Sequence, residues 1–281
     1  ANQTIMRKMN YLTMMALVAI TINFTSCKKD DDTQVSITNE DVTVMQDDAQ
    51  INDMMDDIDN EADEISDVAQ SKSALASDST TYSGREVDRK LNNDGTRTIT
   101  ITYTNFQHPK AKNERIKNGI VYIVVTGSRS DNTYKRIVTF ENFTINNNKI
   151  EGTKTIEKME TLKYKITLTN GKITFTDGSS VTCNYIRYRT MVAGIATPLY
   201  IWDDAYTFEG SASGVTSKNI EYTKTITKAV KIYTAYRYPV EGTFSFTSGD
   251  KTFIFDYGDG TKDNLATITY KDVSKEITLK K

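Results

Sequence analysis

Apolar and polar residues alternate along most of the chain beyond residue 85, and this period of two constrains the fold more than any other feature. In TLKYKITLTNGKITF, residues 161–175, every second residue from Leu162 to Leu168 is apolar, while lysine and threonine fill the positions between them. Successive side chains of a β-strand point to opposite faces, so one face of each strand is expected to be buried and the other solvated. The sequence therefore predicts strands throughout residues 85–281.

Turn residues separate these alternating segments. The expected strands are residues 97–105, 120–128, 134–143, 149–158, 162–169, 172–176, 180–189, 205–211, 220–227, 240–247, 252–257, 265–270 and 275–279. Four junctions contain dipeptides that supply the positive φ of tight hairpins: Asn170-Gly171, Asp177-Gly178, Ser248-Gly249 and Asp259-Gly260. Consecutive hairpins predict an all-β fold, an antiparallel meander of about a dozen short strands, because parallel pairing would need helical crossovers. The meander could close as a barrel-like roll, fold into a sandwich, or be covered by an upstream helix.

A short motif, apolar-Glu-Gly-Thr/Ser, occurs three times in this region. Its copies are residues 150–153, 208–211 and 240–243. Their unequal spacing excludes a strict solenoid repeat. We expect a β-bulge or a strand bend at each glycine, Gly152, Gly210 and Gly242.

The N-terminal region has the features of a secretory signal. Arg7 and Lys8 precede an apolar segment, residues 11–24, that is shorter than the ~20 residues needed to cross a bilayer. We expect Met6 to be the natural start. The segment continues into Thr25-Ser26-Cys27, which resembles a bacterial lipobox, where a signal peptidase cuts before a diacylated cysteine. The alternative is that Cys27 is an ordinary buried or disulfide-bonded cysteine.

The residues after Cys27 extend this resemblance. Acyl chains such as palmitate contribute about 0.8 kcal/mol per buried CH₂, so two or three of them on Cys27 would anchor the chain to a membrane. The run Lys28, Lys29, Asp30, Asp31, Asp32 is similar to the acidic export signal of Bacteroidota surface lipoproteins. It implies a place on the cell outer membrane, facing the medium. A solvated spacer is the alternative interpretation of this charge run.

An acidic segment follows the anchor. Residues 40–67 contain twelve Asp and Glu and no Lys or Arg. Within it, apolar residues recur at helical spacing: Ile51, Met55, Ile58, Ala62, Ile65 and Ala69. We expect an amphipathic helix over residues 47–70. Its acidic face repels itself, so the apolar stripe needs a partner, either the β domain or a second copy in a coiled coil. An EF-hand is disfavoured, because the segment lacks the required ligand spacing and glycine.

Residues 71–84 form a polar linker. Within it, Asp78-Ser79-Thr80 is similar to the Bacteroidota O-glycosylation sequon, which makes Ser79 a candidate glycosylation site. From Thr81 onward the chain has 30 Lys and Arg against 21 Asp and Glu, a net charge of +9, so it can attract the acidic segment. These cations alternate with apolar residues, which is typical of a solvated sheet face, and their dispersal disfavours nucleic-acid binding.

The chain offers little catalytic chemistry. His108 is the sole histidine, so a multi-histidine metal site is excluded, and no nucleophile turn, phosphate loop or dinucleotide fingerprint accompanies it. Cys183 has no partner once Cys27 is acylated, and a buried apolar role is expected for it, with a Cys-His nucleophile as a remote alternative. We expect no cofactor and no metal site. Asp256, Asp259 and Asp263 could bind calcium, but Asp-Gly is ordinary hairpin chemistry.

Carboxylates near an aromatic residue leave a glycan-related option open. Asp203 and Asp204 follow Trp202, with Tyr206 and Glu209 nearby, and glycoside hydrolysis needs two carboxyl groups. Neighbouring strand residues point to opposite faces, so a solvated turn is the favoured role of the Asp pair. Trp202 and Tyr206 are candidate glycan-binding residues. Aromatic residues of β domains more often fill the core.

Three longer stretches resemble a group of β-rich Bacteroidota lipoproteins of unassigned activity: residues 139–158, 203–214 and 255–270. The resemblance implies compartment and fold class and no site residues. The expected organisation is a signal peptide (1–26), a lipidated anchor with export signal (27–39), an acidic helix with linker (40–84) and an antiparallel β domain (85–281). The leading hypothesis is a non-enzymatic surface lipoprotein that acts as a structural or interaction module, with a glycan or protein ligand. The alternatives are a glycan-binding accessory protein of a polysaccharide-uptake system and a hydrolase that uses Asp203 or Glu209.

Overall fold

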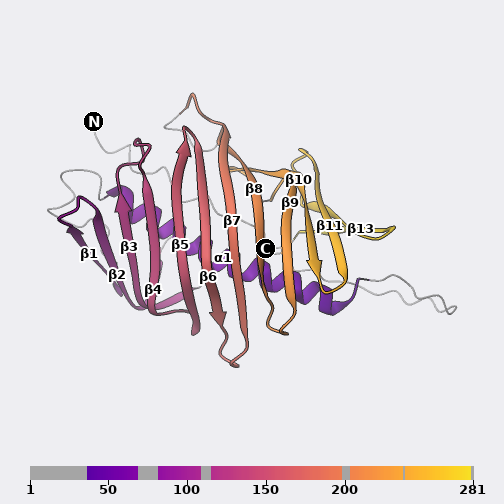
Figure 1. Cartoon of the computed structure of the whole chain (residues 1–281), viewed down its shortest axis with the longest axis horizontal. Coiled ribbons are helices and arrows are strands. Elements are labelled where there is room, and N and C mark those ends of the chain that lie inside the picture. Colours follow the sequence, from indigo (N-terminus) through magenta and orange to yellow (C-terminus); the bar gives the residue numbers. More distant parts are fainter. Residues whose placement is uncertain (1–36, 69–81, 109–114, 198–202, 237, 280–281) are drawn as a thin grey trace.

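The computed structural model describes residues 37–68, 82–108, 115–197, 203–236 and 238–279, which form one helix and thirteen strands (Figure 1). The helix is α1 (Asn39–Val68). The strands are β1 (Arg85–Leu91), β2 (Arg97–Gln107), β3 (Ile116–Thr126), β4 (Lys135–Ile145), β5 (Asn148–Glu160), β6 (Lys163–Thr174), β7 (Ser180–Ala193), β8 (Ala205–Val215), β9 (Glu221–Tyr233), β10 (Glu241–Ser248), β11 (Lys251–Asp259), β12 (Leu265–Tyr270) and β13 (Val273–Thr278).

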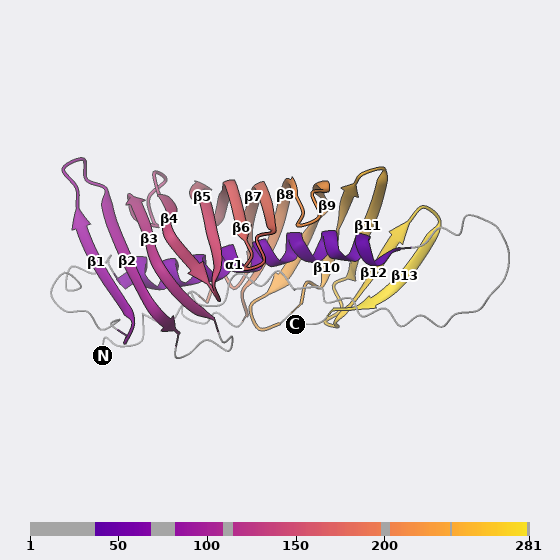
Figure 2. The same cartoon turned by 90° about the horizontal axis from the view of Figure 1, so that it is seen from below.

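All thirteen strands belong to one open sheet in which each strand pairs with its neighbours in the sequence. Every pairing is antiparallel, so the predicted all-β meander is confirmed. The sheet does not close on itself: β1 and β13 are its two edges. Helix α1 instead crosses the strands along one face, as Figures 1 and 2 both show. We call this covered side the inner face and the opposite side the outer face.

Helix α1 begins eight residues earlier than the apolar stripe predicted. Thr38 Oγ1 accepts a hydrogen bond of 3.3 Å from the Asp41 N–H, and Asp41 Oδ2 accepts one of 2.7 Å from the Thr38 N–H. This reciprocal pair is a capping box, which satisfies two donors that a helix start leaves without a partner. The apolar stripe packs on the β domain of its own chain, as one of the two hypotheses predicted.

Two details of the strand assignment were wrong. Asn170-Gly171 does not form a hairpin: it lies within β6, where Asn170 has a φ of 52° and the register with β7 shifts. The Asn170 N–H donates to Asn184 Oδ1 at 2.7 Å, so the positive φ belongs to a bulge. Strand β1 was missed because its sequence, REVDRKL, contains few apolar residues.

The three Glu-Gly motifs are bulges, as expected. Gly152, Gly210 and Gly242 have φ angles of 130°, 127° and 109°, and the strand register shifts at each of them. A Cβ atom at Gly210 would lie 2.1 Å from the Ile186 carbonyl oxygen, so a side chain does not fit there. Such bulges bend the strands that contain them.

The hydrophobic core lies between α1 and the inner face. Helix residues Ile51, Met55, Ile58, Ala62 and Ile65 are all buried, which confirms the predicted stripe for the part of it that the structure describes. They pack with apolar residues of β2–β8. A second cluster joins Met45 to residues of β9–β13, where aromatic rings dominate. The core is therefore one helix deep and extends across the whole sheet.

Candidate functional site

Several predicted site residues lie outside the described part of the chain. These are Cys27, the export signal Lys28, Lys29, Asp30, Asp31 and Asp32, the candidate glycosylation site Ser79, and Trp202. No helix within the described ranges is long and apolar enough to span a membrane.

Tyr206, the other candidate glycan-binding residue, lies on the inner side of β8. Its hydroxyl donates a hydrogen bond of 3.1 Å to Asp204 Oδ2, and its ring lies 5.7 Å from the Arg189 guanidinium carbon. Burial, together with the neighbouring Asp204, raises the pKa of Tyr206. The ring is therefore held against the protein and only half-exposed.

The carboxylates near Tyr206 do not converge. Asp203 is exposed in the turn before β8 and accepts a hydrogen bond of 2.6 Å from Thr197 Oγ1. Glu209 pairs across strands with Tyr188 and lies on the outer face, whereas Asp204 binds Tyr206 on the inner side. The sheet thus separates Glu209 from Asp204, which does not fit a pair of carboxylates acting on one bond.

The two candidate nucleophile components are packed in the structure. His108 lies just after β2, and its ring centroid is 5.5 Å from that of Tyr82 and 6.0 Å from that of Phe106. Cys183 is fully buried on β7, and burial, with a contribution from Asp48, raises its pKa to about 12. The thiol is therefore protonated at neutral pH, in agreement with the expected apolar role.

The three C-terminal aspartates stabilise turns. Asp256 accepts from the Gly258 N–H at 2.8 Å, Asp259 from the Thr261 hydroxyl at 2.8 Å, and Asp263 from the Leu265 N–H at 3.0 Å. Each contact is local, as in ordinary Asp turns. Within the described residues, no group of three or more His, Cys, Asp or Glu side chains could hold a metal ion.

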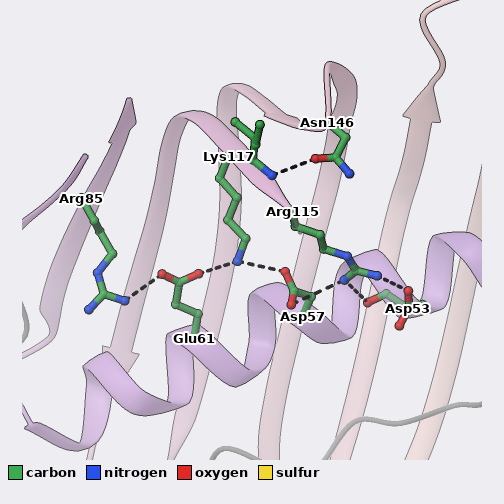
Figure 3. Close-up of polar contacts among 8 residues, drawn as sticks. Asp53, Asp57, Glu61, Arg85, Arg115, Lys117 and Asn146 are labelled. Carbon is green, nitrogen blue, oxygen red and sulfur yellow. Dashed lines mark hydrogen bonds and ion pairs between the residues drawn. The ribbon is translucent and has the colours of Figure 1, made fainter. Parts of the chain in front are cut away.

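The acidic side chains of α1 form ion pairs with the inner face. Glu61 lies between two cations, 2.8 Å from Arg85 Nη1 and 2.5 Å from Lys117 Nζ (Figure 3). Lys117 also lies 2.9 Å from Asp57, and Arg115 contacts both Asp57 and Asp53. Opposite charges thus alternate between helix and sheet.

The ion pairs continue along the helix. Asp59 lies 2.9 Å from Arg136 Nη2 and 2.5 Å from Lys154 Nζ. Burial alone would raise the pKa of Asp59, but Lys154 and Arg136 outweigh burial and lower it. Nearer the helix start, Asp48 lies 3.0 Å from Lys224 Nζ. The carboxylates are therefore held ionised although they are buried.

The interpretation of the basic residues as a solvated sheet face was wrong for six of them. These residues are buried on the inner face: Arg85, Lys117, Arg136, Lys154, Arg187 and Lys224. A buried cation needs a counter-charge or hydrogen-bond acceptors, and α1 supplies these. The sequence contains a signal for such residues, because Lys224 occupies an apolar position of its strand, between Tyr222 and Ile226.

No element in the described ranges covers the outer face. One row of cross-strand neighbours crosses all thirteen strands on this face, and none of its members is buried. This outer row is Lys90, Thr98, Val124, Ile137, Thr155, Thr167, Ile186, Ser211, Thr225, Ser245, Ile254, Thr269 and Ser274. Except for Lys90, the members are hydroxyl-bearing or β-branched. With strands about 4.8 Å apart, the row is roughly 55–60 Å long.

Two tyrosines lie beside the outer row. Tyr122 donates to Glu141 Oε2 at 2.6 Å, and Tyr188 has the Lys163 ammonium 5.6 Å from its ring centroid. Both are half-exposed. The outer face thus combines short hydroxyl groups with accessible aromatic rings.

No family model, no curated protein and no solved structure matches this chain.

Proposed function

We propose that this chain is a non-enzymatic lipoprotein of the outer membrane, anchored through Cys27 and exposed to the medium, and that it acts as a structural or interaction module. The proposed localisation rests on the order of the N-terminal features: a basic start, a short apolar segment, Cys27 and an acidic run. The role rests on one structural observation. The chain's own helix packs across the inner face, so the outer face is the extended surface that no described element covers and that is left for a partner.

The experiment that tests this localisation uses intact cells of the native host. Protease treatment of the cells should release peptides of the β domain, and the mature protein should begin at a lipid-modified Cys27. Retention of residues before Cys27 in the mature protein would contradict the anchor. Protection of the β domain until the cells are lysed would contradict exposure to the medium.

A glycan ligand is the second candidate, and the composition of the outer face favours it. Sugar rings stack on aromatic side chains, and sugar hydroxyls exchange hydrogen bonds with threonine and serine hydroxyls. The outer row and Tyr188 offer both kinds of contact along one surface. A glycan array probed with the wild-type chain and with Tyr188→Ala tests this candidate. Binding that Tyr188→Ala abolishes supports it, and the absence of any bound glycan contradicts it.

A further inference from the structure

A row of inner-face residues near the β5–β6 and β7–β8 turns combines cations with tyrosine rings. Cross-strand pairing places Lys158 beside Tyr164 and Tyr164 beside Arg189. The Arg189 guanidinium carbon lies 5.3 Å from the Tyr164 ring centroid and 5.7 Å from that of Tyr206. Tyr134 packs edge-on against Tyr164, with 6.3 Å between the ring centroids. Arg189 is therefore half-buried among aromatic rings.

Arg189 differs from the inner-face cations that α1 neutralises. Within the described part of the chain its guanidinium makes no hydrogen bond and no ion pair, and it lies against two tyrosine rings. The carboxylate that attracts it is Asp59. That carboxylate already binds Arg136 at 2.9 Å and Lys154 at 2.5 Å. Arg189 is thus a cation in excess of the carboxylates that the structure describes around it.

Like charges surround this excess cation. Burial and the neighbouring Arg129 lower the pKa of Arg189. Burial also lowers the pKa of Arg136, and Arg189 adds to that effect. An anion placed beside Arg189 would relieve this repulsion, because it would supply the counter-charge that the described carboxylates of α1 do not provide.

We propose that Arg189, flanked by Tyr164 and Tyr206, binds an oxyanion: a sulfate, phosphate or carboxylate group, either free or carried by a sugar. The planar guanidinium offers paired N–H donors whose spacing matches two oxygens of such a group. Because Arg189 lies between two rings, the site favours an oxyanion that projects from a narrow ligand rather than the headgroups on the flat surface of a bilayer. The site lies on the opposite face of the sheet from the outer row, so it is separate from the surface in the proposed function.

Titration calorimetry of the purified full chain tests the site, with sodium sulfate, sodium phosphate and glucuronate as ligands at constant ionic strength in chloride. The wild type should bind at least one of them saturably. Arg189→Gln should weaken that binding by about tenfold or more, because a charged, two-point contact is lost. Lys165→Gln, which removes an outer-face cation of the neighbouring strand, should leave it unchanged. No saturable binding to the wild type, or equal loss in both variants, overturns the proposal.

Thermal unfolding gives a second readout that a structural role for Arg189 would not produce. In chloride alone, Arg189→Gln should melt at or above the wild-type temperature, because it removes an unneutralised cation. Sulfate should raise the melting temperature of the wild type more than chloride at equal ionic strength, and this excess should vanish in Arg189→Gln. A lower melting temperature of Arg189→Gln in chloride would overturn the proposal.

Two further arms complete the test. Arg189→Lys is a second variant at the same position: it keeps the positive charge but loses the two-pronged N–H donor geometry of the guanidinium, so anion binding should still weaken, and undiminished binding would overturn the proposal. Vesicles of phosphatidylglycerol, compared with phosphatidylcholine, distinguish the source of the anion. Binding to anionic vesicles that depends on Arg189, without binding of the soluble anions, would overturn the proposal in favour of a lipid headgroup.

Discussion

Arg187 on β7 donates a hydrogen bond of 2.6 Å from Nη2 to Oδ1 of Asn52 on α1, although 135 residues separate the two in the sequence. The same guanidinium lies 4.1 Å from the Tyr185 ring centroid. The side chain of the buried Arg187 therefore contacts a neutral amide and an aromatic ring. The neighbouring buried cations Lys154 and Lys224 instead form ion pairs with carboxylates of α1. Each of these polar side chains of α1 thus has its own partner on the inner face. This pairing fixes the position of α1 along the sheet, because a helix shifted along its axis would separate the partners.

Replacing Lys154 by Met tests the buried ion pairs. Lys154 Nζ lies 3.0 Å from Asp56 and 2.5 Å from Asp59, and all three side chains are almost fully buried. Breaking a buried pair from one side leaves an uncompensated charge, so we expect Lys154→Met to lower the free energy of unfolding by about 3–5 kcal/mol. Urea denaturation measures this loss.

The matched control is Lys135→Met. Lys135 lies 3.1 Å from Glu157 on the outer face, with 42 % and 34 % of the two side chains exposed. A surface pair of this kind contributes about 0–1 kcal/mol. If both variants lost similar stability, the distinction between inner-face and outer-face charges would be incorrect.

Asp48 and Lys224 allow a double-mutant cycle across the helix–sheet interface. Their charged groups are 3.0 Å apart, and Tyr222 also donates to Asp48 at 3.1 Å. We expect each single change, Asp48→Leu or Lys224→Met, to be strongly destabilising, and the double variant to recover much of the loss because no lone charge then remains. Urea denaturation of the four proteins gives the coupling energy. Additive losses would show that the two residues do not act as a pair.

The alternating pattern was sufficient to predict the fold class and most strands, because period-two burial requires no knowledge of distant contacts. Its failures are local. The charged sequence of β1 hides its alternation, and Asn170-Gly171 can serve a hairpin or a bulge equally well, since both need a positive φ. The choice between them depends on the pairing of β6 with β5 and β7.

The ion pairs between α1 and the inner face were harder to predict. The helix charge and the opposite charge of the β domain indicated attraction, but the sequence does not show which carboxylate each cation meets. Lys154 alternates with the buried residues Ile150 and Ile156, so its position indicates the inner face, but nothing near it in the sequence identifies Asp56 and Asp59 as its partners. Asn52 carries no charge to mark it as the partner of Arg187. These contacts depend on strand register, which long-range pairing sets.

Acid should destabilise the protein through its buried carboxylates. Burial would raise the pKa of Asp48, but Lys224 and Arg187 outweigh burial and lower it. A lowered pKa in the folded state adds stability above the unfolded value of about 3.9, and this stability is lost as pH falls through the folded pKa. We expect the melting temperature to fall steeply below about pH 4. Asp48→Asn should reduce that slope, and an unchanged slope would contradict the assignment.

Cys183 should not react with thiol reagents in the native protein at neutral pH. Burial, with Asp48 nearby, raises its pKa to about 12, so the nucleophilic thiolate is scarce as well as inaccessible. Colour release from a disulfide reagent at pH 8 measures the reaction, with urea-unfolded protein as the control. Labelling at the rate of the unfolded chain would contradict the burial of Cys183.

Replacing Gly210, the glycine of the second Glu-Gly motif, should destabilise the protein more than replacing a glycine in an open turn. It combines a φ of 127° with a Cβ position 2.1 Å from the Ile186 carbonyl oxygen, so Gly210→Ala must both strain the backbone and displace β7. Gly178 also has a positive φ, 86°, but no atom lies within 4 Å of its Cβ position, so it isolates the cost of the dihedral angle alone. We expect Gly178→Ala to lower the free energy of unfolding by about 1 kcal/mol and Gly210→Ala by about 3 kcal/mol or more. Urea denaturation of both variants checks the difference, and equal losses would show that the bulge in β8 tolerates a side chain.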